Sequence, residues 1–189
     1  MINRVRAFAV AAALATLPAV ASAQDKQFEV GTKLLNVGVI VGSESYGSFG
    51  VGGGLEVGFK DIEGKVTLGI GGSIGIARSS YGNVFGNFGY TSTAVPILGF
   101  VHGHYQVESV PKLDLYAGPA LGVSLARYSY DDGYCNGSNS SFCSGNVSDV
   151  AGGIQAGARW ALTPAVLGWA QVSGGTRMPF LNAGVSFKF

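Results

Sequence analysis

The chain contains little charge. Lys, Arg, Asp and Glu make up 12% of its 189 residues, about half their usual share in a soluble domain. The 12 basic and 11 acidic residues leave a formal net charge of +1, whereas a nucleic-acid-binding protein needs a basic face. We therefore expect no nucleic-acid partner.

Long apolar runs are missing from most of the chain. After residue 23, no stretch approaches the ~20 apolar residues of a transmembrane helix. Lipid offers no hydrogen bonds, so an apolar exported chain without such a run can cross a membrane only as a closed sheet.

The N-terminus is the exception. Arg4 and Arg6 precede an apolar run over residues 7–20, and Ala21-Ser22-Ala23 follows as a small-residue cleavage site. These three parts in this order predict a Sec signal peptide over residues 1–23 and a mature domain over 24–189.

Cysteine is scarce. Cys135 and Cys143 are the only two, and both lie in the longest predicted connection. An even pair in an exported chain predicts a disulfide, which would stabilise this loop by about 2–3 kcal/mol.

The chain does contain a regular alternation of apolar residues with small or polar ones. Apolar side chains recur at every second position in eight segments, as in strands with two unlike faces. The segments are 33–41, 54–60, 65–77, 94–107, 113–128, 150–162, 166–174 and 181–189. Short turns at 61–64, 108–112 and 163–165 alternate with connections at 42–53, 78–93, 129–149 and 175–178, most of them longer. The pattern predicts an all-β, eight-stranded antiparallel up-and-down transmembrane barrel with short periplasmic turns and longer extracellular loops. Only the facing of segment 166–174 stays open.

Small residues fill much of the predicted inward face. They are Gly69, Gly71, Ser73, Gly75, Gly118, Ala120, Gly122, Gly157 and Gly184. Either they leave space for larger side chains on other strands, since eight strands enclose just enough room for side chains, or they serve sheet curvature and close strand approach.

Several charged residues share this inward face. They are Glu56, Lys60, Asp114, Arg159 and Lys188, with His102 and His104 beside them. Glu56 and Arg159 lie at similar heights above their turns, on strands that are opposite in an eight-stranded barrel. We therefore predict a Glu56–Arg159 ion pair that plugs the periplasmic half of the lumen, because a buried charge needs a partner. The alternative is separate residues solvated by trapped water.

The whole segment 24–189 resembles the small bacterial outer-membrane β-barrels, namely the OmpA transmembrane-domain, OmpX and opacity-porin-like group. The strongest support for the resemblance is the C-terminal strand, which ends on Phe189 after Phe187 and Val185. In that group the terminal aromatic is recognised by the barrel-insertion machinery. The resemblance implies the Gram-negative outer membrane, contact with its lipid and lipopolysaccharide, and a surface ligand or host partner bound through loops.

Function is less specified than fold. The resemblance implies a structural or surface-interaction role, as an adhesin or a membrane-integrity protein, with side chains filling the lumen. One alternative is a narrow pore for small or apolar solutes, similar to the OmpW group, which Leu98 and Phe100 beside Pro96 would suit. Another is a lipid-modifying enzyme.

The two histidines allow three interpretations. His102 and His104 are two residues apart and so share a strand face. They are structural lumen residues, or part of a metal site to which Glu56 could add a third ligand, or catalytic groups. Lipid A deacylase barrels place a His and a Ser two apart, but here His104 stands at the Ser position. We therefore predict no catalytic residue, no metal and no cofactor.

Overall fold

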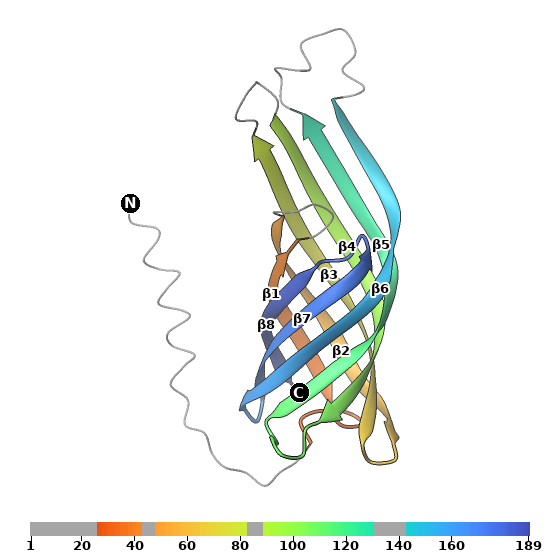
Figure 1. The fold of residues 1–189 in the computed structure, drawn as a ribbon, viewed down its shortest axis with the longest axis vertical. Helices are drawn as coiled ribbons and strands as arrows, with labels where there is room; N and C mark the ends of the chain where they lie inside the picture. The colour runs from red at the N-terminus through yellow and green to blue at the C-terminus, as the bar shows by residue number, and fades with distance from the viewer. Residues whose placement is uncertain (1–25, 43–47, 83–88, 131–142) are drawn as a thin grey trace, which may run out of the picture.

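The computed structural model describes residues 26–42, 48–82, 89–130 and 143–189. Eight antiparallel strands form a closed barrel in which each strand pairs with its sequence neighbours and β8 pairs with β1 (Figure 1). The strands are β1 (Lys33–Val41), β2 (Phe49–Ile62), β3 (Val66–Gly82), β4 (Gly89–Gln106), β5 (Leu113–Tyr130), β6 (Ser144–Thr163), β7 (Val166–Thr176) and β8 (Leu181–Lys188). The predicted barrel is confirmed. The predicted signal peptide lies outside the described residues.

The outside of the barrel is apolar. Its exposed side chains include Leu35, Val57, Ile70, Ile74, Leu121, Ile154 and Val172. No helix among the described residues is long and apolar enough to cross a membrane. In β7 the open question of facing is answered: Leu167 is buried at 1% exposure, whereas Val172 is 50% exposed.

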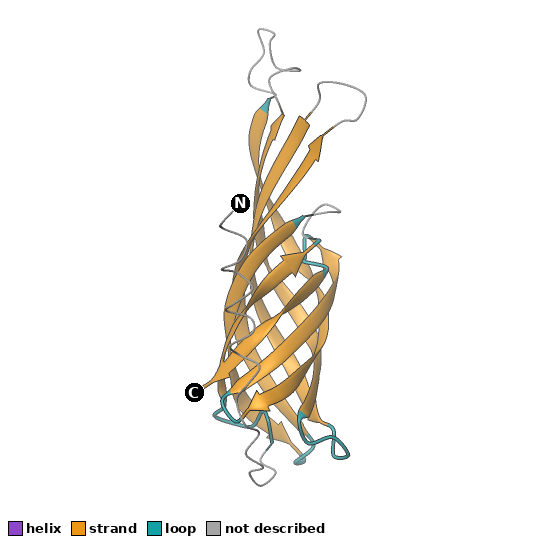
Figure 2. Cartoon of the chain, turned by 90° about the vertical axis from the view of Figure 1, so that its left-hand side faces the viewer, coloured by secondary structure: helices purple, strands orange, loops and turns teal. Residues whose placement is uncertain are grey.

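The strands extend beyond their predicted ends on one side of the barrel. β3, β4, β5 and β6 have 17, 18, 18 and 20 residues, whereas β1 and β8 have 9 and 8. The predicted loops 42–53, 78–93 and 129–149 are therefore partly strand. Apolar alternation stops where a strand leaves lipid, but the hydrogen-bonded ladder continues. The β3–β6 sheet thus protrudes as a wall above the shorter strands (Figure 2).

The opposite end closes with short connections. Between β2 and β3, Glu63 and Gly64 have φ angles of 51° and 70°, and the Lys65 N–H donates to the Ile62 carbonyl at 3.0 Å. Two successive positive φ angles within such a hydrogen-bonded turn are the signature of type I′, whose twist matches the flanking strands. This end is the predicted periplasmic end.

Candidate functional site in the lumen

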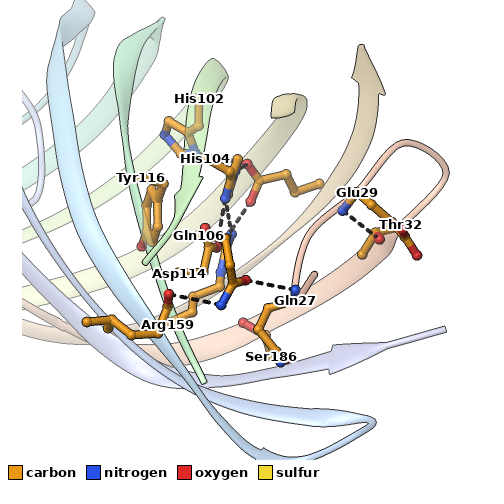
Figure 3. A network of polar contacts seen from close by, with 12 residues as sticks. Gln27, Glu29, Thr32, His102, His104, Gln106, Asp114, Tyr116, Arg159 and Ser186 are labelled. Atoms are coloured by element: carbon orange, nitrogen blue, oxygen red, sulfur yellow. Dashed lines mark hydrogen bonds and ion pairs between the residues drawn. The ribbon is translucent and has the colours of Figure 1, made fainter. Parts of the chain in front are cut away.

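A polar cluster fills the lumen near the short-turn end. We call it the lumen cluster; it consists of Glu56, His102, His104, Asp114, Tyr116 and Arg159. β2 supplies the glutamate, β4 the histidines, β5 the aspartate and tyrosine, and β6 the arginine. Each of these residues is at most 3% exposed. The alternation of each strand turns these side chains inward together (Figure 3).

Arg159 joins the two carboxylates of the cluster. Its Nη2 donates a hydrogen bond to Glu56 Oε2 across the lumen, and its Nη1 lies 3.7 Å from Asp114 Oδ2. The guanidinium carbon also lies 4.4 Å from the centre of the Tyr116 ring, a distance at which the ring face attracts a cation. The structure therefore brings Glu56 and Arg159 into the contact that the sequence predicts.

His104 bridges the same two carboxylates. Its Nε2 is 2.9 Å from Glu56 Oε1 and its Nδ1 is 2.8 Å from Asp114 Oδ2. A protonated imidazole donates with both nitrogens. With that proton, the two carboxylates are balanced by one imidazolium and one guanidinium, and the buried cluster is neutral.

His102 lies farther from the short-turn end of the barrel than His104. Its Nδ1 is 3.0 Å from Glu56 Oε1, and its Nε2 is 3.0 Å from Gln155 Oε1. The ligand atoms of Glu56, His102 and His104 lie within 4.8 Å of one another, so geometry alone would allow a metal ion. However, hydrogen bonds already occupy these atoms, and the Arg159 charge beside Glu56 opposes a further cation.

Phe28 closes the cluster from below. Its ring stacks on His104 with the ring centres 3.8 Å apart, and only 4% of the residue is exposed. The segment before β1 is held under the barrel, since Gln27 N–H donates to Gln106 Oε1 at 2.9 Å and Gly31 N–H to the Gly58 carbonyl at 2.8 Å (Figure 3). Together Phe28 and the lumen cluster form a plug.

Lys60 does not join the cluster, contrary to the prediction. A register shift between Gly58 and Lys60 leaves Phe59 as an extra residue in β2. A bulge of this kind reverses the facing of the residues after it. Lys60 is consequently exposed, and Asp61 takes the position opposite the buried Thr67.

A small cavity lies above the plug. It has a volume of about 70 Å³, and its lining includes Pro96, Leu98, Phe100, Trp169 and Asn182. Trp169 Nε1 and Asn182 Oδ1 have no hydrogen-bond partner within the described part of the chain, and ordered water would satisfy them. The predicted apolar lining of a pore is thus present, but it ends on the lumen cluster.

The remaining predicted sites are placed only in part. Cys135 lies outside the described residues, so its disulfide with Cys143 stays a prediction. Phe187 and Phe189 are 40% and 70% exposed, near the short-turn end. Phe28 is not among the predicted site residues, because it precedes every alternating segment. Tyr116 and Gln155 are also absent from the predicted site, although alternation places both on the inward face.

Inward glycines serve both predicted roles, since they allow close strand approach and make room for lumen side chains. A Cβ at Gly71 would lie 2.3 Å from the Leu55 carbonyl oxygen and 2.5–2.6 Å from Phe100 ring atoms, whereas one at the outward Gly72 would have its nearest neighbour, the Leu98 carbonyl, at 3.4 Å. We expect Gly71→Val to destabilise the barrel by about 1–3 kcal/mol through overpacking. Gly72→Val, the matched control, should be neutral or stabilising, because valine suits a strand. Urea unfolding in lipid vesicles measures both, and equal effects would contradict the packing role of Gly71.

An eight-stranded closed barrel with an apolar outside and a filled lumen is the architecture of small outer-membrane proteins. Solved structures of that class match this chain. Ail of Yersinia pestis matches with a TM-score of 0.54 and 13% identity, covering 85% of this chain and 99% of Ail. A second Ail structure, in complex with the heparin analogue sucrose octasulfate, gives 0.53 and 14%, with coverages of 85% and 99%. OprG of Pseudomonas aeruginosa gives 0.51 and 12%, covering 87% of this chain and 99% of OprG.

No protein-family model and no curated protein sequence matches the chain. The likeness therefore lies in the fold. The protein is an eight-stranded antiparallel β-barrel with the fold of the small outer-membrane proteins of Gram-negative bacteria.

Proposed function

We propose that this protein is a non-conducting, non-enzymatic barrel that acts at the cell surface. The observation that carries the proposal is the plug, in which buried side chains from four strands and Phe28 meet across the lumen. A continuous water path would have to pass the Arg159–Glu56 contact and the Phe28–His104 stack. The working surface is then the protruding β3–β6 wall rather than the lumen.

Aromatic side chains support a binding role for the wall. Tyr90 and Tyr130 have ring centres 5.2 Å apart, and Tyr128 and Tyr130 have ring centres 6.1 Å apart. These rings lie above the apolar belt, near the outer ends of β4 and β5. Tyrosine is enriched at protein interfaces, where its ring packs and its hydroxyl forms hydrogen bonds. A glycan or a host protein fits this surface. Sucrose octasulfate, the compound bound to Ail, is a suitable first probe.

Conductance tests the closed lumen. In a planar lipid bilayer, the refolded parent should produce no discrete openings, because the plug interrupts the lumen. An open porin reconstituted in the same way serves as the positive control, and heat-dependent gel mobility verifies that the silent protein is folded. Reproducible single-channel steps from the folded parent would overturn the proposal and favour the narrow pore.

We also propose that residues 1–23 direct export and are cleaved after Ala23, and that the insertion machinery recognises Val185, Phe187 and Phe189 of the C-terminal strand. The proposal also includes the Cys135–Cys143 disulfide as a stabiliser of the outer loop. The alternation of β8, with Phe187 exposed and Ser186 fully buried, presents the aromatic side of the strand outward, where that machinery would meet it.

A further inference from the structure

Two arginines lie on the outer surface of the wall at the same height. The strand register aligns Arg78 of β3 with Thr93 of β4, and Thr93 with Arg127 of β5. Both arginines are exposed, and Thr93 is half-buried between them. Neighbouring strands are ~4.8 Å apart, so about 10 Å separates the two arginine backbones. Their long side chains can therefore reach one common group above Thr93.

This row marks the outer edge of the apolar belt. The outward residues just below it are apolar: Ile76, 50% exposed, in β3 and Leu125, 44% exposed, in β5. From Val66 to Ile76, β3 rises about 25 Å along the barrel axis at ~3.3 Å per residue and a tilt of ~40°, which is the height of the lipid-facing band. Arg78 is the next outward residue, so the arginines lie at the level of the lipid headgroups on the protruding side.

The row above the arginines consists of hydroxyl groups. The register aligns Ser80 with Thr91, Thr91 with Ser129, and Ser129 with Ser144. Ser80 Oγ and Thr91 Oγ1 are 3.3 Å apart. A cationic row below a hydroxyl row is complementary to a phosphate attached to a sugar.

Neither Arg78 nor Arg127 takes part in an ion pair with any described residue. The nearby Arg177 differs, since its Nη2 lies 2.8 Å from Asp149 Oδ2. Two guanidinium groups at headgroup level, without an ion-pair partner in the described part of the chain, would attract an anion. Guanidinium is also the side-chain group best suited to bind phosphate through paired hydrogen bonds.

We propose that Arg78 and Arg127 bind a phosphate of a phosphorylated glycolipid, the lipid A part of lipopolysaccharide, in the outer leaflet. Thr93 supports the same phosphate, and the hydroxyl row contacts the adjoining sugar. The acyl chains then lie along the belt below Ile76 and Leu125. The site is on the outside of the barrel, so it does not depend on a closed lumen.

Native mass spectrometry of the refolded protein in detergent tests this site, with bisphosphorylated lipid A as the probe. We expect one or more lipid A molecules to bind the parent, and Arg78→Gln and Arg127→Gln to weaken binding by about tenfold each, since each removes a hydrogen-bonded charge. Arg177→Gln is the matched control and should bind like the parent. Parent-like binding by the Arg78→Gln/Arg127→Gln double variant would overturn the proposal.

Two further lipids show whether the site recognises a phosphorylated glycolipid or any lipid phosphate. Dephosphorylated lipid A retains the sugars but should bind at least tenfold more weakly, since it lacks the phosphate that the arginines would bind. Phosphatidylglycerol retains a phosphate without the disaccharide and should compete poorly. Equal competition by phosphatidylglycerol would show a general anion site and overturn the glycolipid assignment. All substituted positions are exposed, and heat-dependent gel mobility checks that each variant is folded.

Discussion

Arg159→Met should lower the free energy of unfolding by about 3–5 kcal/mol, because it removes the permanent positive charge that contacts both buried carboxylates. Glu56 and Asp114 are 0% and 1% exposed, and Arg159 contacts both. Methionine keeps most of the side-chain length and removes the charge. Urea unfolding in phospholipid vesicles, followed by tryptophan fluorescence, measures the change.

Arg177→Met is the control for this prediction. Its ion pair with Asp149 has both side chains 40% exposed, so its loss should change stability by at most about 1 kcal/mol. A Glu56→Gln/Arg159→Met double variant should be more stable than the sum of the two single effects, since both charges of the pair leave together. Additive effects, or an Arg159→Met variant as stable as the control, would mean that the contact does not hold the lumen together.

Phe28→Ala should be nearly as harmful, at about 3–5 kcal/mol, because it removes a buried aromatic ring and leaves a cavity. The ring covers His104 at the short-turn end, and its loss would also admit water to the lumen cluster. Urea unfolding gives the loss of stability, and hydrogen exchange at β4 reports the new access to water.

Phe180→Ala is the matched control, since Phe180 is 64% exposed. It should leave both measurements close to those of the parent. If Phe28→Ala behaves like Phe180→Ala, the segment before β1 is only attached to the barrel and does not close it.

Alternation made most of the fold predictable, because lipid outside and a packed lumen inside impose unlike faces on every strand. It also placed Glu56, His102, His104, Asp114 and Arg159 on the inward face of the barrel. It failed at Lys60, because a single bulged residue, Phe59, inverts the pattern and carries no distinctive sequence signal.

Two other features could not be predicted from the sequence, for other physical reasons. The outer parts of β3–β6 leave the lipid, so their outward positions become Ser, Thr and Arg and no longer alternate in hydrophobicity. The sequence therefore predicts loops at positions where the hydrogen-bonded ladder continues. Phe28 belongs to no strand, and only tertiary contact with His104 reveals its place.

The unequal strand lengths also have a mechanical consequence. β5 and β6 are 18 and 20 residues long, whereas β1 and β8, which form the closing seam, have only 9 and 8 residues. Every other ladder joins neighbours in sequence, but this seam joins the two ends of the chain and carries the largest loop-closure entropy. It should therefore form last during assembly. When the C-terminus is pulled, this seam should separate at a lower force than the longer ladders of the wall.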